Sequence, residues 1–148
     1  MKIDDKLRLK NQLCFPLYVA SKEITKLYRP FLDEIDLTYT QYIAMIVLWE
    51  HEQMSVKDLG EMLYLDSGTL TPLLKKLEEK GFIERNRASY DERNVIISLT
   101  KNGKNLHDKA ALVPDKMSAC VCYDEKNAKQ LYELLYGLIG KISPSHKR

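Results

Sequence analysis

The chain has 148 residues, 45% of them hydrophobic and 30% charged, which is typical of one soluble globular domain. The formal net charge of +2 is compatible with nucleic-acid binding but not diagnostic of it. The first ten residues lack the apolar core of a signal peptide, and no stretch approaches the roughly 18 apolar residues that cross a bilayer, so we expect a cytoplasmic protein with reduced cysteines and no membrane partner.

The first predicted helix runs from about residue 5 to Tyr28, and the pair Arg29-Pro30 marks its expected end. Pro16 should kink or delay this helix, because proline removes a backbone hydrogen bond. Cys14 lies at the edge of its apolar stripe, so the local sequence favours a small core residue, the usual role of a free cysteine. The stripe itself recurs at helical spacing and comprises Leu13, Leu17, Ala20, Ile24 and Leu27.

Three more helices are predicted between residues 38 and 80, the last of them from about residue 67 after a tight turn at 64–66. Gly81 is a natural stop for that last helix. The first two helices begin with capping patterns, which are formed by Thr38 with Gln41 and by Ser55 with Asp58. The residues expected on the buried faces are Tyr42, Met45, Ile46, Trp49, Val56, Leu59, Met62, Leu63, Leu70, Leu73, Leu74 and Leu77.

A β-hairpin is predicted over residues 82–99, because FIERNR and residues 95–99 have strand patterns on either side of the polar segment ASYDERN. Thr100 should cap a further helix, which Pro114 should bend or interrupt. Asp124 should start the last helix. The apolar stripe of that helix comprises Ala128, Leu131, Leu135, Leu138 and Ile142.

Two short helices, a tight turn and a charged hairpin together indicate a winged helix-turn-helix that binds DNA. The exposed residues of the second helix are small or cationic, as a helix in a major groove requires. The alternative is that they form an ordinary solvent-exposed helix face. The hairpin that follows favours DNA binding over this alternative. These residues are Ser67, Gly68, Thr69, Thr71, Pro72, Lys75 and Lys76.

The tip of the hairpin carries an arginine that is suited to a minor groove. A guanidinium binds best where an A·T-rich groove is narrow and its potential most negative, and we assign this role to Arg93. Asp91 could hold Arg93 in place. A surface ion pair of little energetic value is the alternative for these two residues.

The run LYLDSGTLTPLLKKLEEKGFIERNRASYDERNVIISLTKNGK, residues 63–104, resembles the MarR family of dimeric winged-helix regulators. The runs NQLCFPLY and KLYRPFLDEIDLTYTQYIAMIVLWEHE resemble its OhrR branch, the repressors that sense organic hydroperoxides. The resemblance implies a mainly α fold with a small β-hairpin wing. It implies a single domain, residues 1–148, in which about 1–36 and 105–148 form dimerisation helices and about 37–104 the winged helix-turn-helix.

The resemblance also gives Cys14 a second interpretation. In the OhrR branch the cysteine of the NQLCF motif reacts with peroxide, and two tyrosines of the other subunit hydrogen-bond to it. The matching residues here are Cys14, Tyr28 and Tyr39. This chemistry is sensible, because the thiolate is the nucleophile and a phenol that donates to sulfur stabilises it.

Some members of the branch carry a second cysteine near the end of the sixth helix. Here Cys120 or Cys122 could resolve a sulfenic acid on Cys14 of the partner, although a small thiol could cap Cys14 instead. The alternative for both residues is that they are small buried side chains. The two cysteines together with His107 could suggest a zinc site, but further ligands are missing. We therefore expect no metal and no cofactor.

The sequence therefore predicts a repressor, not an enzyme, that leaves an inverted-repeat DNA operator when an organic hydroperoxide oxidises Cys14 of the homodimer. A MarR-like regulator that answers to a small aromatic ligand or acts globally, with Cys14 structural, is the alternative within the family. A thiol peroxidase is the alternative from another class. The winged helix argues against the peroxidase.

Overall fold

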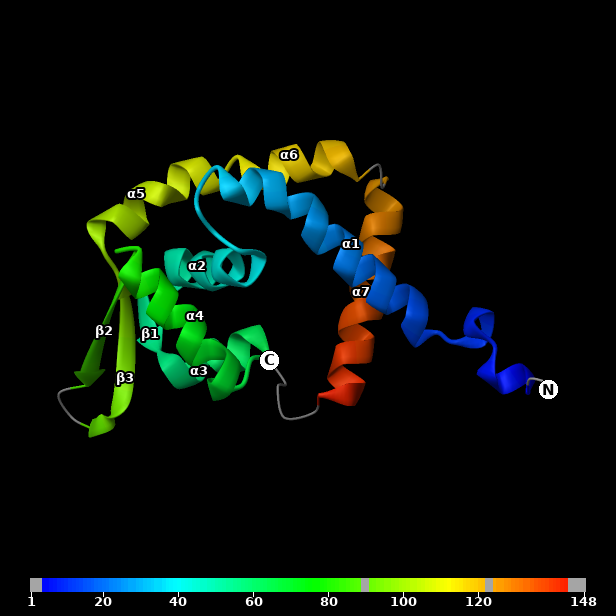
Figure 1. The fold of residues 1–148 in the computed structure, drawn as a ribbon, viewed down its shortest axis with the longest axis horizontal. Helices are drawn as coiled ribbons and strands as arrows, with labels where there is room; N and C mark the ends of the chain where they lie inside the picture. The colour runs from blue at the N-terminus through cyan, green and yellow to red at the C-terminus, as the bar shows by residue number, and fades with distance from the viewer. Residues whose placement is uncertain (1–3, 89–90, 122–123, 144–148) are drawn as a thin grey trace.

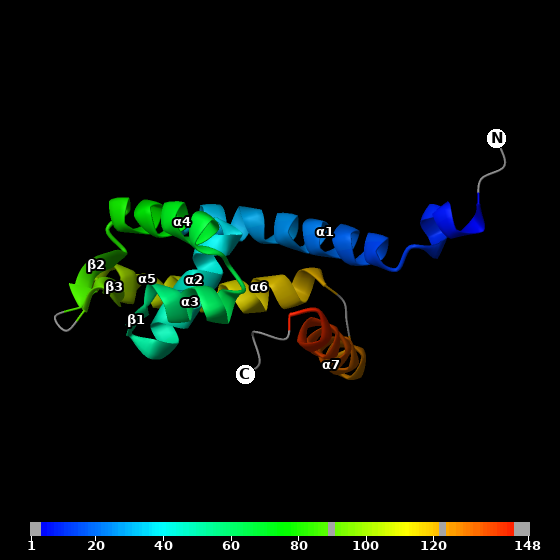
Figure 2. The same ribbon diagram turned by 90° about the horizontal axis from the view of Figure 1, so that it is seen from below.

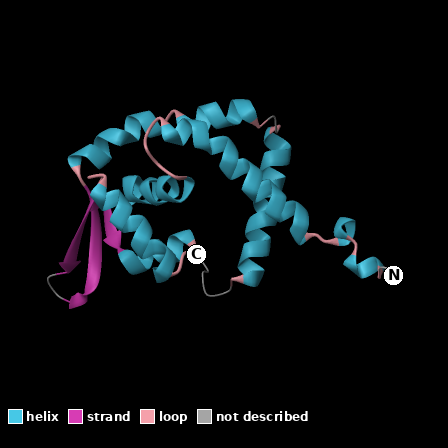
Figure 3. Ribbon diagram, viewed as in Figure 1, coloured by secondary structure: helices cyan, strands magenta, loops and turns pink. Residues whose placement is uncertain are grey.

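The computed structural model describes residues 4–88, 91–121 and 124–143, and it confirms a mainly helical fold with a small antiparallel sheet (Figures 1, 2 and 3). Two short 3-10 helices precede the α-helices. The elements are η1 Asp5–Leu7, η2 Leu9–Asn11, α1 Cys14–Asp33, α2 Tyr39–His51, β1 Gln53–Ser55, α3 Val56–Leu63, α4 Ser67–Glu79, β2 Ile83–Ala88, β3 Asp91–Leu99, α5 Lys101–Ala110, α6 Val113–Cys120 and α7 Glu125–Ile142.

Helix α1 starts and ends later than the sequence predicts. The segment before Cys14 forms the two 3-10 turns, and Pro16 lies in the first helical turn, where a backbone N–H has no partner within the helix in any case. Pro30 lies inside α1 and does not end it. The carbonyl that loses its partner belongs to Lys26, which is exposed, so water can satisfy it and the helix continues to Asp33.

The predicted caps of the later helices are confirmed. Thr38 and Gln41 form a reciprocal capping box at α2, and Ser55 accepts a hydrogen bond from the Asp58 backbone N–H at α3. Further side-chain caps are Asp66 at α4, Thr100 at α5 and Asp124 at α7. Pro114 lies in the first turn of α6, so the predicted interruption occurs as a break between α5 and α6.

The sheet has the order β1-β3-β2, and its first strand is absent from the sequence prediction. Strand β1 has three residues, too few to show a period-two pattern. It pairs with residues 96–98 of β3 and so holds the base of the hairpin against the helices. The part of the hairpin nearer the tip extends past this support (Figures 1 and 3).

The core lies around α2 and α4, and the four predicted leucines of α4, residues 70, 73, 74 and 77, are buried in it. Tyr42, Met45 and Leu59 are buried as predicted. The prediction is wrong for Ile46 and Met62, which are 41% and 43% exposed, because the buried faces of α2 and α3 are narrower than the apolar pattern. None of the described helices is both long and apolar enough to span a membrane.

Gly103 brings α5 into close contact with the segment that leads into β2. A Cβ placed on Gly103 would lie 2.0 Å from the carbonyl oxygen of Phe82. The carbonyl of Gly103 accepts a 2.8 Å hydrogen bond from Trp49 Nε1. The backbone N–H of Gly103 donates to Thr100 Oγ1 at 3.0 Å. A side chain at this position therefore cannot be accommodated without moving the backbone and straining these bonds.

We expect Gly103→Ala to lower the free energy of unfolding by about 3 kcal/mol, because its methyl group overlaps backbone that cannot move as a side chain would. Denaturation in urea measures this change. Asn105→Ala is the matched control, since Asn105 is exposed on the same helix and should change the unfolding free energy by less than about 0.5 kcal/mol. Equal stability of the two variants would contradict the packing argument.

Candidate DNA-binding face and candidate redox cysteine

The cap at Asp66 fixes the start of α4, the helix that we predicted to contact DNA. The Asp66 carboxylate accepts hydrogen bonds from the Thr69 backbone N–H at 3.0 Å and from Thr69 Oγ1 at 3.1 Å. These hydrogen bonds lower the pKa of Asp66 below its ordinary value. The Thr69 hydroxyl therefore donates within the protein, and its lone pairs and methyl group remain for a ligand.

All predicted DNA-contacting residues of α4 are exposed, and they form a ridge between two depressions. Ser67, Gly68, Thr69, Thr71, Pro72, Lys75 and Lys76 make up this ridge. On one side, Thr69, Pro72 and Lys76 line a depression of about 290 Å³ together with Thr38 and Thr40 at the start of α2. The other side faces the hairpin.

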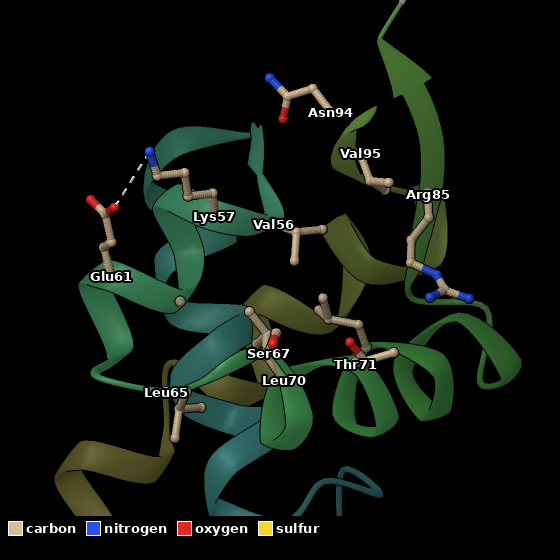
Figure 4. A pocket seen from close by; sticks show the side chains of 12 residues that line it. Val56, Lys57, Glu61, Leu65, Ser67, Leu70, Thr71, Arg85, Asn94 and Val95 are labelled. Atoms are coloured by element: carbon tan, nitrogen blue, oxygen red, sulfur yellow. Dashed lines mark ion pairs between the residues drawn. The ribbon is translucent and has the colours of Figure 1, made fainter. Parts of the chain in front are cut away.

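A larger cleft, of about 550 Å³, separates α3 and α4 from the hairpin (Figure 4). Ser67 and Thr71 of α4 line it, and Arg85 and Val95 of the hairpin face them. Lys57 and Glu61 of α3 lie at its rim as an exposed ion pair of 4.0 Å. Helix α4, the recognition helix of the predicted helix-turn-helix, and the hairpin are thus separate projections on either side of this cleft.

Asp91 and Arg93 lie in β3, which begins earlier than the predicted strand at residue 95. Their side chains are outside the part that the structure describes, so the minor-groove role of Arg93 and the supporting role of Asp91 stay predictions. The side chains of the hairpin are described from Asn94 onward and up to Arg87.

Cys14 is the first residue of α1 and is exposed in the single chain. Apolar side chains flank it and are also exposed, with Leu13 at 75%, Phe15 at 41% and Tyr18 at 63%. The interpretation of Cys14 as a core residue is therefore wrong for the single chain. The thiol lies within an apolar surface that is open to a ligand or to a second chain.

Tyr28 and Tyr39 meet where α1 and α2 come together, with ring centroids 4.9 Å apart. Burial raises the pKa of Tyr39, and the neighbouring Tyr28 adds to the shift. Tyr39 therefore stays protonated at neutral pH and can donate a hydrogen bond. Tyr28 follows Cys14 by 14 residues on α1, about 21 Å along the helix axis, so the pair does not contact Cys14 of the same chain.

Cys120 is the last residue of α6 and is exposed. Cys122, the other candidate resolving cysteine, lies outside the described residues. His107, the third residue considered for zinc, packs edge-on against Trp49 with ring centroids 5.6 Å apart. Within the described ranges, no cluster of three or more His, Cys, Asp or Glu residues could hold a metal ion.

Two ion pairs at the end of α4 are absent from the sequence prediction. Arg85 of β2 donates to Glu78, and Lys80 Nζ donates to the carbonyl and carboxylate oxygens of Asp36, at 2.5 Å and 3.0 Å. For the first pair, the available sequence signal was the placement of opposite charges seven residues apart on either side of Gly81, where the chain reverses. Sequence alone does not tell such a pair from two solvated charges.

The chain is similar to known transcriptional regulators over most of its length. A family model described as "Transcriptional regulator SarA/Rot" matches residues 26–110. The "Organic hydroperoxide resistance transcriptional regulator" of Bacillus subtilis is 50% identical over 135 residues, which cover 91% of this chain and 92% of that protein.

Solved structures of AbfR, a Staphylococcus epidermidis protein, share the fold. The structure of reduced AbfR bound to DNA is 35% identical, covers 93% of this chain and 96% of its own, and superposes with a TM-score of 0.78. The structure of disulfide-formed AbfR is 36% identical, covers 91% and 95%, and has a TM-score of 0.64. The present conformation is thus more similar to the reduced, DNA-bound form.

Proposed function

We propose a peroxide-responsive repressor function for this chain, which belongs to the MarR family of transcriptional regulators and to its OhrR type. The chain is a transcriptional regulator and not an enzyme, because its relatives are named as transcriptional regulators. The finer proposal is that it binds an inverted-repeat operator as a homodimer and releases it when an organic hydroperoxide oxidises Cys14. The observation that carries it is the exposed thiol of Cys14 in an apolar surface.

The exposed ridge of α4 supports binding in a major groove. Its small side chains allow close approach to base edges, and Lys75 and Lys76 are exposed, so their ammonium groups can neutralise phosphates. The hairpin projects beside the ridge, so its tip, with Arg93, can enter the adjacent minor groove. DNA binding would then involve residues 37–104, as proposed for the winged helix-turn-helix.

The helices at the two ends of the chain support a homodimer through about residues 1–36 and 105–148. Helix α7 has 18 residues and buries none of them in the single chain. Exposed apolar residues on α7 include Leu131 and Leu134, at 40% and 65%. An amphipathic helix without a covered face requires a partner, and a second copy supplies one with two-fold symmetry.

A second copy would also bring tyrosines to the thiol. Since Tyr28 and Tyr39 lie far from Cys14 along their own chain, the partner's pair is the one that can donate to it. The Cys14 thiolate attacks the distal oxygen of the hydroperoxide, the O–O bond breaks, and the alcohol leaves after taking a proton. The sulfur becomes a sulfenic acid, which a second thiol converts to a disulfide with loss of water.

The test is a gel shift with the purified protein and DNA from upstream of its own gene. The reduced protein should bind, cumene hydroperoxide should release the DNA, and dithiothreitol should restore binding. The peroxide consumed should equal about one equivalent per reactive thiol. Continuous turnover with a thiol reductant would instead indicate a peroxidase, and unchanged DNA binding would remove the redox function.

Lys76 should contribute more to DNA binding than Lys75. Lys76 lies beside the start of α2. By contrast, Lys75 Nζ is 3.8 Å from the Glu79 carboxylate, which partly neutralises the charge of Lys75. We expect Lys76→Ala to weaken binding to all sequences and to reduce the slope of log affinity against log salt by about 1 for each phosphate that is no longer neutralised. Lys75→Ala should have a smaller effect, and salt titrations of both variants check the order.

Oxidation should link the two protomers through Cys14 and Cys120 of the partner. Cys120 ends α6, where the two-cysteine members of the branch place their second thiol. We expect a reducible dimer band on a non-reducing gel, which Cys120→Ser abolishes and Cys122→Ser retains. Wild-type protein that leaves the DNA without forming the band would instead indicate capping by a small thiol.

A further inference from the structure

Glu78 of α4 and Arg85 of β2 form a close ion pair between the recognition helix and the hairpin. Arg85 Nε and Nη2 donate to the same Glu78 carboxylate oxygen at 2.8 Å and 2.5 Å. Their side chains are 37% and 29% exposed, so the contact is partly shielded from water. The two N–H groups define a direction as well as a distance, which a lysine could not do.

The pair joins α4 to β2, the strand of the hairpin with which β1 does not pair. Strand β1 covers β3 only over residues 96–98, at the base of the hairpin. Arg85 is opposite Ile97 in the β2–β3 register, in the middle of this base, and its side chain lines the large cleft between the hairpin and α4 (Figure 4). Beyond it, the two strands extend toward the tip with Arg93.

Glu78 is otherwise unfavourably placed in a helix that binds DNA. It lies near the C-terminus of α4, where the helix dipole disfavours a negative charge, and it belongs to the helix that would approach phosphates. The Arg85 guanidinium lowers the pKa of Glu78, so the carboxylate is retained and neutralised. A role in fixing geometry would explain a carboxylate at this position.

We propose that the Glu78–Arg85 ion pair is a positioning pair, which sets the angle between α4 and the hairpin so that both enter their grooves together. This proposal rests on the proposed DNA-binding function, because the angle has a role only if both elements contact one duplex. Neither residue needs to touch DNA. Loss of the pair should let the hairpin tip move relative to α4 and reduce the minor-groove contribution.

Glu79 provides a matched control on the same helix. Its carboxylate lies 3.8 Å from Lys75 Nζ, and both side chains are well exposed. Glu78→Gln and Glu79→Gln remove the same charge one residue apart. If charge alone matters, both substitutions strengthen DNA binding to the same degree, because each removes repulsion from phosphates.

The positioning role predicts opposite outcomes for the two variants. Glu78→Gln should weaken binding by about tenfold, or about 1.4 kcal/mol, while Glu79→Gln should leave it equal or stronger. Glu78→Gln should also lose the preference for A·T-rich over G·C-rich flanks without a change in salt slope. Adding Arg85→Gln to Glu78→Gln should cost little more, since the two residues act as one unit.

Hydrogen–deuterium exchange of the reduced protein without DNA tests the pair independently of its function. Backbone amides of residues 84–87 and 94–96 should exchange about fivefold faster in Glu78→Gln than in Glu79→Gln. Equal exchange would overturn the proposal whether or not the chain binds DNA. Faster exchange with the DNA affinity of the Glu79→Gln control would also overturn it. Failure of the wild-type protein to bind any operator would instead overturn the proposed function, with the exchange difference intact.

Discussion

Replacing Cys14 by Ser should leave operator binding by the reduced protein unchanged and should abolish release by cumene hydroperoxide. Serine is close in size, and Cys14 is exposed at the start of α1, so the fold loses no packing in the single chain. The hydroxyl is not a nucleophile toward peroxide at neutral pH, whereas the thiolate is. Fluorescence anisotropy of labelled operator, recorded while peroxide is added, measures the response.

Cys120→Ser is the control for this experiment, since it removes the other thiol described as exposed. That variant should still react at Cys14 and form a sulfenic acid, which a dimedone probe can trap. Tyr28→Phe and Tyr39→Phe should slow the reaction by removing donors to the thiolate. Release of the Cys14→Ser variant by peroxide would show that the sensing cysteine is elsewhere.

Replacing Leu131 by Glu should convert the protein to a monomer and reduce operator affinity by about a hundredfold, because the two recognition helices would no longer bind as one linked unit. Leu131 belongs to the apolar stripe of α7 and is 40% exposed in the single chain. The substitution should therefore have little effect on the fold of the protomer itself. Sedimentation equilibrium gives the mass, and an operator with two half-sites gives the affinity.

Lys129→Gln is the matched control, because it changes the net charge by the same amount on the opposite face of α7. It should remain a dimer and should bind the operator with wild-type affinity within about twofold, as surface substitutions away from an interface usually do. If Leu131→Glu remains dimeric and binds DNA normally, α7 does not form the interface. The dimerisation role of the C-terminal helices would then be wrong.

The elements that depend on residues close together in the sequence could be predicted from the sequence alone. The caps at Thr38, Ser55, Thr100 and Asp124 are hydrogen bonds that span three residues, so the residue types that form them are visible in the chain. The leucines of α4 are buried as their spacing indicates, since one face of a short helix is enough to define its core side. The winged helix-turn-helix follows from the order of these elements.

The extent of α1 and the strand β1 were decided by the tertiary structure. Pro30 does not end α1, because the carbonyl that it leaves unpaired belongs to an exposed residue, Lys26, and water can satisfy it. Strand β1 exists because the backbone of residues 53–55 lies beside β3, and three residues alone have no pattern to show this. Both outcomes depend on what lies next to the segment in space.

The candidate sites likewise depend partly on the sequence and partly on the tertiary structure. Residue type indicates the α4 ridge, and the resemblance to the OhrR branch indicates Cys14 and the two tyrosines, because residue type and motif carry the chemistry of a thiol, a phenol or a cation. Only the tertiary structure brings Tyr28 against Tyr39 and Arg85 against Glu78. Such contacts join side chains from different elements, and their strength depends on distance, direction and exclusion of water, none of which is encoded in the spacing of residues along the chain.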